Sequence, residues 1–350
     1  MYQSFVNSNK DLIYSFFNFI PKDSNGSDFE NILNNNLDKL RPLYESKKYK
    51  QILSTIKPEF HSEFKSTVLN AFALQLYDVY KIYTSGEKIF RAEENFTLQM
   101  LNTEFKEIPA KLIKLPYNTI ELQVPYQYFN VDNTTIQYIN TIVIDSSRKF
   151  DDSTEFAITF YGHDKFTNTI TPQYHSFIVL NHDEDIQKQF HQQLKKQLEE
   201  DENTKNHFKG GTISSNFEHY KRTLSFVFNT LLYISSPEKQ IDYIIDGQER
   251  LQKLKGKERQ KYKKKLNDKP KIGIIGGKII LSNTDRQLYL DRLQSNGNPL
   301  TVKVLVMGHW RQQWYGSKQQ DNLHQKAIWI QPFWRGIENE IISNKIHILI

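Results

Sequence analysis

Apolar residues repeat at steps of three and four in one segment near the N-terminus, which is the spacing of an amphipathic helix. Within residues 64–83 they are Val68, Leu69, Phe72, Leu76, Val79 and Tyr80. Ser85 and Gly86 follow as a stop signal. We therefore predict a helix over 64–83 and a mainly helical region up to about residue 110. The Asn-rich stretch 31–36 fits either a helix or a loop.

From Lys111 onward the pattern becomes that of strands. Four short runs rich in β-branched and aromatic residues, 119–124, 138–145, 155–161 and 175–180, are separated by turn residues such as Pro125 and Pro172. Short runs at this spacing are typical of an antiparallel meander. We expect them to form the central sheet.

Helical patterns return after the meander. Residues 185–201 carry a narrow apolar stripe, and Ser215 and Glu218 form a capping-box pattern that predicts the start of a more buried helix. That second helix should end before Pro237.

The C-terminal part predicts further strands. Runs 272–275 and 278–281 flank Gly276 and Gly277, a pattern that predicts a tight hairpin, and runs 300–307 and 326–330 also resemble strands. The predicted fold is α+β, with an N-terminal helical region (1–110), an α+β core with a central, mostly antiparallel sheet (111–248), a basic linker (249–271) and a C-terminal β-hairpin and Trp-rich region (272–350).

Composition narrows the class of protein. Hydrophobic residues make up 38% of the 350, which is enough for a substantial core, and no apolar run is long enough to span a membrane. Cysteine is absent, which excludes disulfides and thiolate chemistry. The first 20 residues lack the pattern of a signal peptide. We expect a cytoplasmic protein of a bacterial cell, with no membrane partner.

The positive charge is concentrated in residues 250–271, which hold eleven basic residues and two acidic ones, although the whole chain has a net charge of only +6. Such a run is a solvated linker or helix, or it contacts the phosphates of mRNA or the ribosome. The candidates for such contacts are Lys253, Lys255, Lys257, Arg259, Lys261, Lys263, Lys264 and Lys265.

Sequence motifs of catalysis are weak. The glycines at 273, 276 and 277 lack the spacing of a phosphate loop, and the acidic residues 183–185, which follow His182, are explained by a helix N-terminus. Two Glu-x-Lys triplets, beginning at Glu63 and Glu104, have no suitably placed aspartate. We expect no enzyme activity, no cofactor, no metal site and no small-molecule substrate.

All four tryptophans lie between residues 310 and 334. Tryptophan and arginine together are typical of binding hot spots. His309, Arg311, Trp314 and Tyr315 are expected in a polar loop, on a surface or groove. Trp329 lies in a run that is apolar on both faces, which favours a place in the core.

The same C-terminal segment resembles a known family. Gly308-His309-Trp310-Arg311, Trp314-Tyr315-Gly316 and Trp329-Ile330-Gln331-Pro332 are similar to the signature of a type V-A anti-CRISPR family carried by phages, plasmids and other mobile elements. Leu115-Pro116 and the apolar residues 231–234 add weaker similarity.

The resemblance implies a non-catalytic inhibitor that recognises the N-terminal peptide of a nascent CRISPR effector nuclease and causes loss of its mRNA. The residues expected to bind that peptide are His309, Trp310, Arg311, Trp314, Tyr315, Trp329, Trp334 and Arg335. Met307 and the long basic run depart from the family pattern, which leaves the identity of the target open.

Two alternatives stand beside this interpretation. A nucleic-acid-binding protein of a mobile element would act through residues 250–271, and its binding would weaken steeply with salt. A nuclease that cleaves the mRNA itself would degrade RNA and lose this activity with a chelator.

Overall fold

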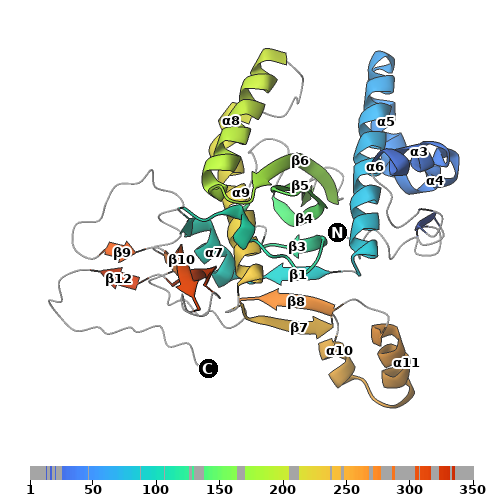
Figure 1. The fold of residues 1–350 in the computed structure, drawn as a ribbon. Helices are drawn as coiled ribbons and strands as arrows, with labels where there is room; N and C mark the ends of the chain where they lie inside the picture. Colours follow the sequence, from blue (N-terminus) through green and yellow to red (C-terminus); the bar gives the residue numbers. More distant parts are fainter. Residues whose placement is uncertain are drawn as a thin grey trace.

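A seven-stranded mixed sheet forms the centre of the protein, with the strand order β6-β5-β4-β3-β1-β8-β7 (Figure 1). The computed structural model describes residues 13–335 with interruptions, the longest of which are 21–25, 130–137, 164–169, 205–212, 277–285, 288–303 and 317–322. Four of the six strand pairs are antiparallel and two are parallel. The predicted α+β class with a mostly antiparallel sheet is confirmed.

The four predicted meander strands are present and pair in chain order. They are β3 (Thr119–Gln123), β4 (Ile139–Lys149), β5 (Ser153–His163) and β6 (Ile170–Asn181). Alternate residues such as Ile142, Ile158 and Ile178 point to one side and are fully buried there. The enrichment in β-branched and aromatic residues between turn residues is the signal that made these strands visible in the sequence.

The other half of the sheet was harder to predict. Strand β1 (Ile89–Ala92) pairs in parallel with β3 and with β8 (Lys271–Ile275), and β7 (Ile241–Ile245) pairs antiparallel with β8. The mainly helical region therefore gives way to a central strand at residue 89. The first run of the predicted hairpin, 272–275, forms most of β8, which lies between β1 and β7; the second run, 278–281, lies outside the described residues.

Glycine is needed at the end of β8. Gly276 has a φ of +76°, and a Cβ atom there would lie 2.3 Å from Cβ of Phe96. Both the left-handed backbone and the close approach of the next layer exclude a side chain. Gly276 thus ends β8 at the point where the strand meets Phe96 of the helical layer.

N-terminal helices lie on one face of the sheet, where the last and longest of them packs directly against β3 and β6. They are α3 (Gly26–Asn34), α4 (Leu37–Tyr44), α5 (Lys47–Thr55), the short η1 (Pro58–Phe60) and α6 (His61–Thr84). Helix α6 matches the prediction, and Ser85 and Gly86 end it as expected. Residues 31–36 form the end of α3 and the turn before α4.

A buried carboxyl lies between α6 and the sheet. Asp78 of α6 accepts a hydrogen bond from the Tyr161 hydroxyl at 2.7 Å. Burial raises the pKa of Asp78 to about 7, so the carboxyl keeps its proton well above its ordinary range. The contact holds α6 on β5.

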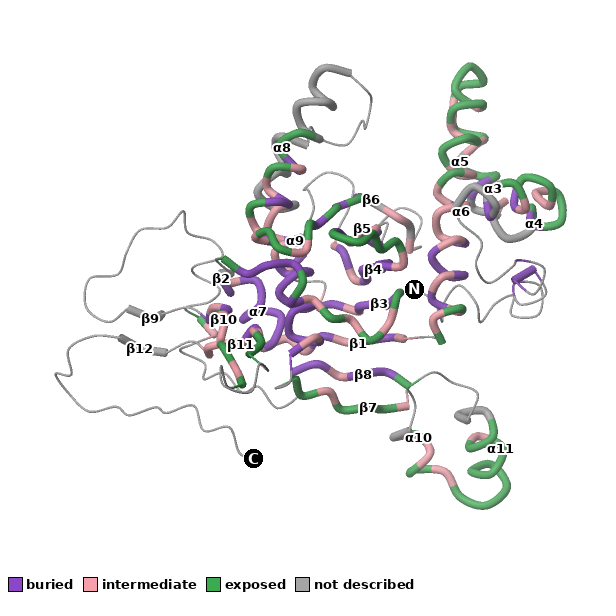
Figure 2. Tube along the Cα trace, in the orientation of Figure 1, coloured by how far each residue is buried: buried purple, intermediate pink, exposed green. Residues whose placement is uncertain are grey.

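The opposite face of the sheet carries α7 (Glu94–Asn102), η2 (Ala110–Leu112), α8 (Ile186–Thr204) and α9 (Ile213–Ser235). Helix α9 begins two residues before Ser215, so the predicted capping box lies inside the helix. Its end before Pro237 is confirmed. Figure 2 shows the buried residues concentrated along α9 and the central strands. None of the described helices combines the length and apolarity needed to cross a bilayer.

Two glutamines of α8 close part of the sheet edge at β6. Gln193 accepts a hydrogen bond from the Val179 amide at 2.9 Å and donates one to the Val179 carbonyl. Gln189 makes the same pair of contacts with the backbone of Asn181. The side-chain amides therefore take the place of a neighbouring strand.

The remaining elements are a small sheet, a strand pair and two helices. They are β2 (Glu104–Phe105), β10 (His309–Tyr315) and β11 (His324–Ile330), then β9 (Val304–Val306) with β12 (Phe333–Arg335), and α10 (Gln248–Lys253) with α11 (Gly256–Asn267). They hold the residues predicted to act in binding.

Candidate functional site

An antiparallel hairpin made of β10 and β11, here called the hairpin, contains six of the eight residues predicted to bind a peptide. All seven residues of β10 pair with β11, from His309 opposite Ile330 to Tyr315 opposite His324. The prediction of a polar loop at 309–315 was wrong. Aromatic residues favour extended backbone, and Gly316 with a φ of +95° makes the turn that ends the strand.

The inner face of the hairpin is anchored in the core. Trp310 is only 3% exposed, and its indole Nε1 donates a hydrogen bond to Asn229 Oδ1 at 3.0 Å. Trp329, directly opposite Trp310, packs partly buried against the core with its ring edge-on to Tyr233. These two tryptophans therefore stabilise the hairpin from beneath.

Asn229 connects the hairpin to two helices. From the middle of α9, its side-chain amide donates to the carbonyl oxygens of Met100 and Thr103 at 2.9 and 3.0 Å, while its oxygen accepts from Trp310. All three contacts are buried. Sequence reasoning missed this residue, although a lone asparagine within an apolar helix was a signal that it has buried partners.

The outer face consists of the residues that alternate with Trp310 and Trp329. They are His309, Arg311, Gln313 and Tyr315 of β10 and His324, Lys326, Ile328 and Ile330 of β11. Lys326 Nζ lies 4.7 Å from the centre of the Tyr315 ring, which stacks on His324. The Arg311 guanidinium is exposed and donates to Gln313 at 3.1 Å.

This face is basic and aromatic, with no acidic residue in either strand. Trp314 lies on the same side of β10 as Trp310, but at the end of the strand it extends beyond the core and is 56% exposed. His324 and Lys326 were missed in the sequence, because only the strand pairing brings them beside Tyr315.

The outer edge of the hairpin is open among the described residues. In the small sheet, β10 lies between β11 and the two residues of β2, so β11 is an edge strand. An edge strand presents unpaired backbone groups that another extended chain can use. The face and the edge together form a surface suited to an extended peptide.

Trp334 and Arg335 do not belong to the hairpin, because they lie in a different pair of strands. They belong to β12, where Trp334 pairs with Leu305 and Arg335 with Val304 of β9. Their side chains lie outside the described residues. Their role in peptide binding stays a prediction.

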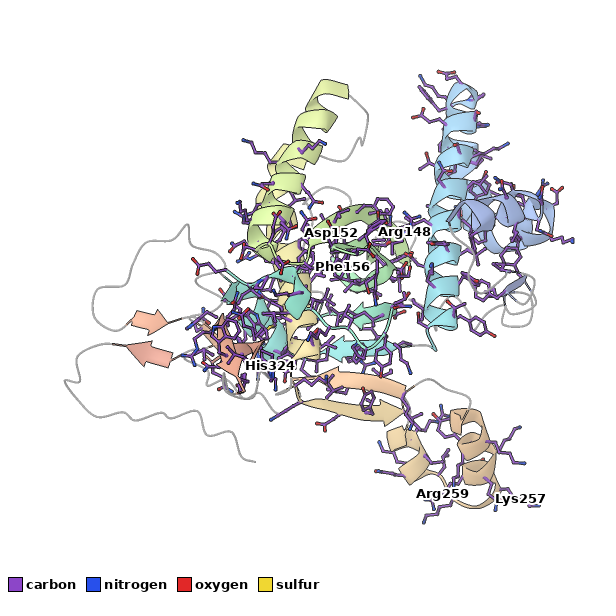
Figure 3. All side chains as sticks on the ribbon, viewed as in Figure 1. Arg148, Asp152, Phe156, Lys257, Arg259 and His324 are labelled. Atoms are coloured by element: carbon purple, nitrogen blue, oxygen red, sulfur yellow. The ribbon has the colours of Figure 1, made fainter. Side chains whose placement is uncertain are left out.

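The basic residues form a separate region made of α10 and α11, here called the arm. Of the eight predicted contacts, all except Lys265, whose side chain is not described, are exposed. The arm projects from the end of β7 and β8, and Figure 3 shows Lys257 and Arg259 far from His324 of the hairpin. Arg250 of α10 lies over the Tyr262 ring of α11, 5.4 Å from its centre.

The titratable residues of the described chain form no group of three or more that could hold a metal ion. The acidic residues at 183–185 act locally instead. Asp185 accepts hydrogen bonds from the Ile108 and Lys188 amides, as expected at the start of α8.

Comparison with known proteins gives a consistent picture. A family model described as AcrVA2-like, anti-CRISPR type V subtype A2 family, matches residues 93–336, which include both the hairpin and the arm. Among solved structures, a crystal structure of AcrVA2 aligns with 95% of this chain and 96% of its own, at 14% identity and a TM-score of 0.46. No curated protein sequence matches significantly.

Proposed function

Because the chain belongs to the AcrVA2-like anti-CRISPR type V subtype A2 family, we propose that it binds the N-terminal peptide of a nascent type V-A CRISPR effector nuclease and lowers the expression of that nuclease. An anti-CRISPR function follows from the membership itself. In the proposal, the protein acts in the cytoplasm of the bacterial host, as a binding protein and not as an enzyme, and the mRNA of the nuclease is lost as a result.

The observation that carries the proposal is the combination of an open strand edge with an exposed aromatic and basic face. An extended peptide that pairs with β11 gains main-chain hydrogen bonds, while alternate side chains reach neighbouring side chains of the hairpin. A nascent chain is extended and unfolded, so it can pair in this way without first losing structure.

The outer face offers two kinds of contact along β11. Ile328 and Ile330 are half-buried and present an apolar surface, on which the flexible side chain of an initiator methionine can pack. Arg311 and Lys326 can donate to carbonyl or carboxylate oxygens of the peptide. Trp314 adds a large exposed ring at the end of the strand.

A pull-down from a translating extract tests this function. The tagged protein is added while the nuclease mRNA is translated, and both the nascent chain and its mRNA are quantified in the captured fraction. We expect both to be recovered and to be displaced by a synthetic peptide of the nuclease N-terminus. The double variant Arg311→Ala/Trp314→Ala should reduce recovery about tenfold or more.

A matched control also removes one basic residue and one exposed aromatic residue, but outside the hairpin. Lys57→Ala/Phe60→Ala changes two exposed residues before α6 and should leave recovery unchanged. Recovery that resists both the competitor peptide and the hairpin variant would show that the hairpin does not bind the nascent chain.

The exposed cations of the arm favour a second function, binding to RNA. Seven described basic side chains on two solvated helices can neutralise phosphates without reading sequence. We expect single-stranded RNA to bind in a fluorescence polarisation titration, and binding to weaken steeply between 50 and 200 mM salt, over which the Debye length shortens about twofold. Lys257→Gln/Lys261→Gln/Lys264→Gln should flatten this salt dependence, whereas the hairpin variant should not.

A further inference from the structure

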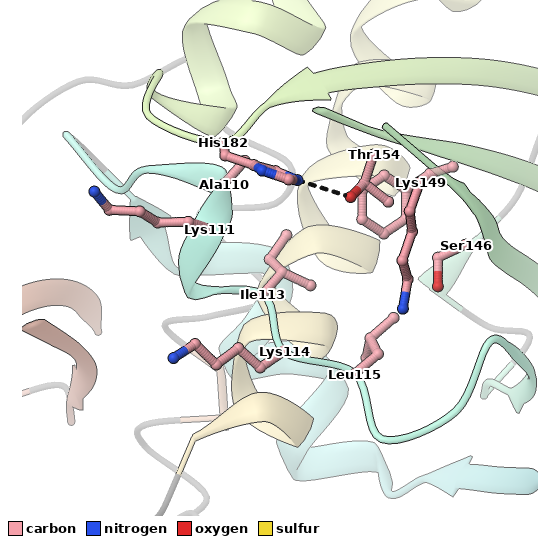
Figure 4. Close-up of a pocket in the computed structure, with 10 residues that line it drawn as sticks. Ala110, Lys111, Ile113, Lys114, Leu115, Ser146, Lys149, Thr154 and His182 are labelled. Carbon is pink, nitrogen blue, oxygen red and sulfur yellow. Dashed lines mark hydrogen bonds between the residues drawn. The ribbon is translucent and has the colours of Figure 1, made fainter. Parts of the chain in front are cut away.

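A cavity of about 270 Å³ lies on the face of the sheet that carries α8 and α9, and none of its lining residues belongs to the hairpin or the arm (Figure 4). Three segments line it: the loop around η2, the ends of β4 and β5 next to their turn, and His182 directly after β6. Its volume is near the lower end of the ~300–1,000 Å³ typical of small-molecule sites, which suits a ligand of the size of one nucleotide.

Basic side chains surround the cavity. Lys111, Lys114, Lys149 and His182 line it, and no carboxylate does. Only Lys111 has an ionic partner among the described residues, Asp183 at 2.7 Å, and this contact lowers the pKa of Asp183. Lys114 and Lys149 are exposed and make no ion pair with any described residue. The cavity therefore has uncompensated positive charge.

The centre of the cavity is apolar. Ile113, Leu115 and Phe156 contribute side chains to its wall, and Figure 4 shows Ile113 between the lysines of the η2 loop and Lys149. His182 is held by Thr154, whose Oγ1 lies 3.1 Å from its Nε2, so one polar group is fixed beside the apolar wall. A ligand that matches this arrangement has a flat apolar body and an anionic group.

We propose that this cavity binds a nucleoside monophosphate, with the base against Ile113, Leu115 and Phe156 and the phosphate among the lysines. A phosphate monoester carries a charge of ~−1.5 to −2 at neutral pH, which matches two unpaired lysines better than the single charge of a carboxylate. Lysine is a common phosphate ligand because its ammonium acts as a point charge. The cavity is too small to hold several nucleotides of an RNA chain.

Isothermal titration calorimetry with the full chain tests the proposal. Adenosine 5′-monophosphate is the probe, and adenosine and inorganic phosphate represent its two halves. We expect saturable binding of the monophosphate and at least tenfold weaker binding of each half. The variant Lys114→Gln/Lys149→Gln should weaken binding of the monophosphate at least tenfold, while its circular dichroism spectrum and Tm stay those of the unmodified protein.

The control variant Lys65→Gln/Lys188→Gln removes two exposed lysines that do not line the cavity and should keep the original affinity. The proposal fails if the monophosphate does not saturate the protein, or if the cavity variant and the control bind it equally. Equal binding of adenosine, or of benzoate as an aromatic carboxylate, would overturn the assignment to phosphate. None of these residues belongs to the hairpin or the arm, so the result is independent of peptide and RNA binding.

Discussion

The hairpin and the arm are both exposed and basic, yet the protein holds them in opposite ways. Trp310 and Asn229 fix the hairpin to α7 and α9 through buried hydrogen bonds, so its outer side chains have defined positions. Among the described side chains of the arm, the apolar ones are at most half-buried, and they are Leu251, Leu254 and Tyr262. A rigid surface can distinguish one peptide from another, whereas cations on solvated helices respond mainly to the charge density of their partner.

The largest expected effect comes from removing the anchor of the hairpin. Asn229→Leu keeps a similar volume but leaves the Met100 and Thr103 carbonyls and the Trp310 indole without their buried partner. Each such group costs ~1–3 kcal/mol, so we expect the free energy of unfolding to fall by about 5 kcal/mol. Urea unfolding followed by tryptophan fluorescence measures this.

The adjacent residue provides the control. Thr230 is equally buried, but its hydroxyl has no hydrogen-bond partner among the described residues. Thr230→Val should therefore change the stability by less than ~1 kcal/mol or increase it. Equal losses in the two variants would contradict the special role of Asn229.

Asp78 of α6 is a second buried polar group that holds two elements together, and it should make the free energy of unfolding depend on pH. The carboxyl ionises near pH 4 in the unfolded chain but only near pH 7 in the folded protein. The folded state therefore binds the extra proton between these values, and stability falls as pH rises through them. Asp78→Asn should remove this fall, which amounts to about 4 kcal/mol.

Urea unfolding at pH 4.5 and pH 8 compares the two proteins. The exposed Asp38 serves as the control, since Asp38→Asn should keep the pH dependence of the unmodified protein. An unchanged fall in the Asp78→Asn variant would show that another group is responsible.

Substituting one glycine in the sheet and one in the arm compares how tightly the two regions are packed. Gly276→Ala combines a left-handed φ with a Cβ that would overlap Phe96, and we expect a loss of about 3 kcal/mol. Gly256, at the start of α11, also has a positive φ of +55° but nothing within 4 Å. Gly256→Ala should cost only ~1 kcal/mol. Similar losses in thermal unfolding would mean that the arm is as tightly packed as the sheet.

The smallest effect is expected within the arm. Arg250→Ala removes the guanidinium over the Tyr262 ring, a contact worth ~0.5–1 kcal/mol. Hydrogen exchange should become faster in α11 and stay unchanged in β10. Faster exchange in both regions would show that they are coupled.

Sequence patterns predicted the elements whose residue types and spacing carry a local signal. Strands β3 to β6 were visible as short runs of β-branched and aromatic residues between turn residues, and helix α6 was visible from the spacing of its apolar residues. Strand β1 was missed, since it has four residues, three of them buried, and a short strand between parallel neighbours shows no alternation. Strand β7 was missed for the opposite reason, because three of its five residues are exposed.

The candidate site was predictable in composition but not in geometry. The tryptophan cluster and the basic run can be seen directly in the amino-acid sequence. That Trp310 lies inside while Arg311 lies outside depends on Asn229, 81 residues earlier in the chain. The lysine cavity depends on three segments that only the folded chain brings together.

The two glutamines on α8 also make part of one edge of the large sheet unavailable to other strands. A bare sheet edge recruits other β-strands, including those of identical molecules, and is a common origin of aggregation. Gln189 and Gln193 occupy the backbone groups of β6 that a second copy would need, at Val179 and Asn181. Among the described strands, β11 therefore keeps an open edge, whereas part of the β6 edge is closed to a second copy of the chain.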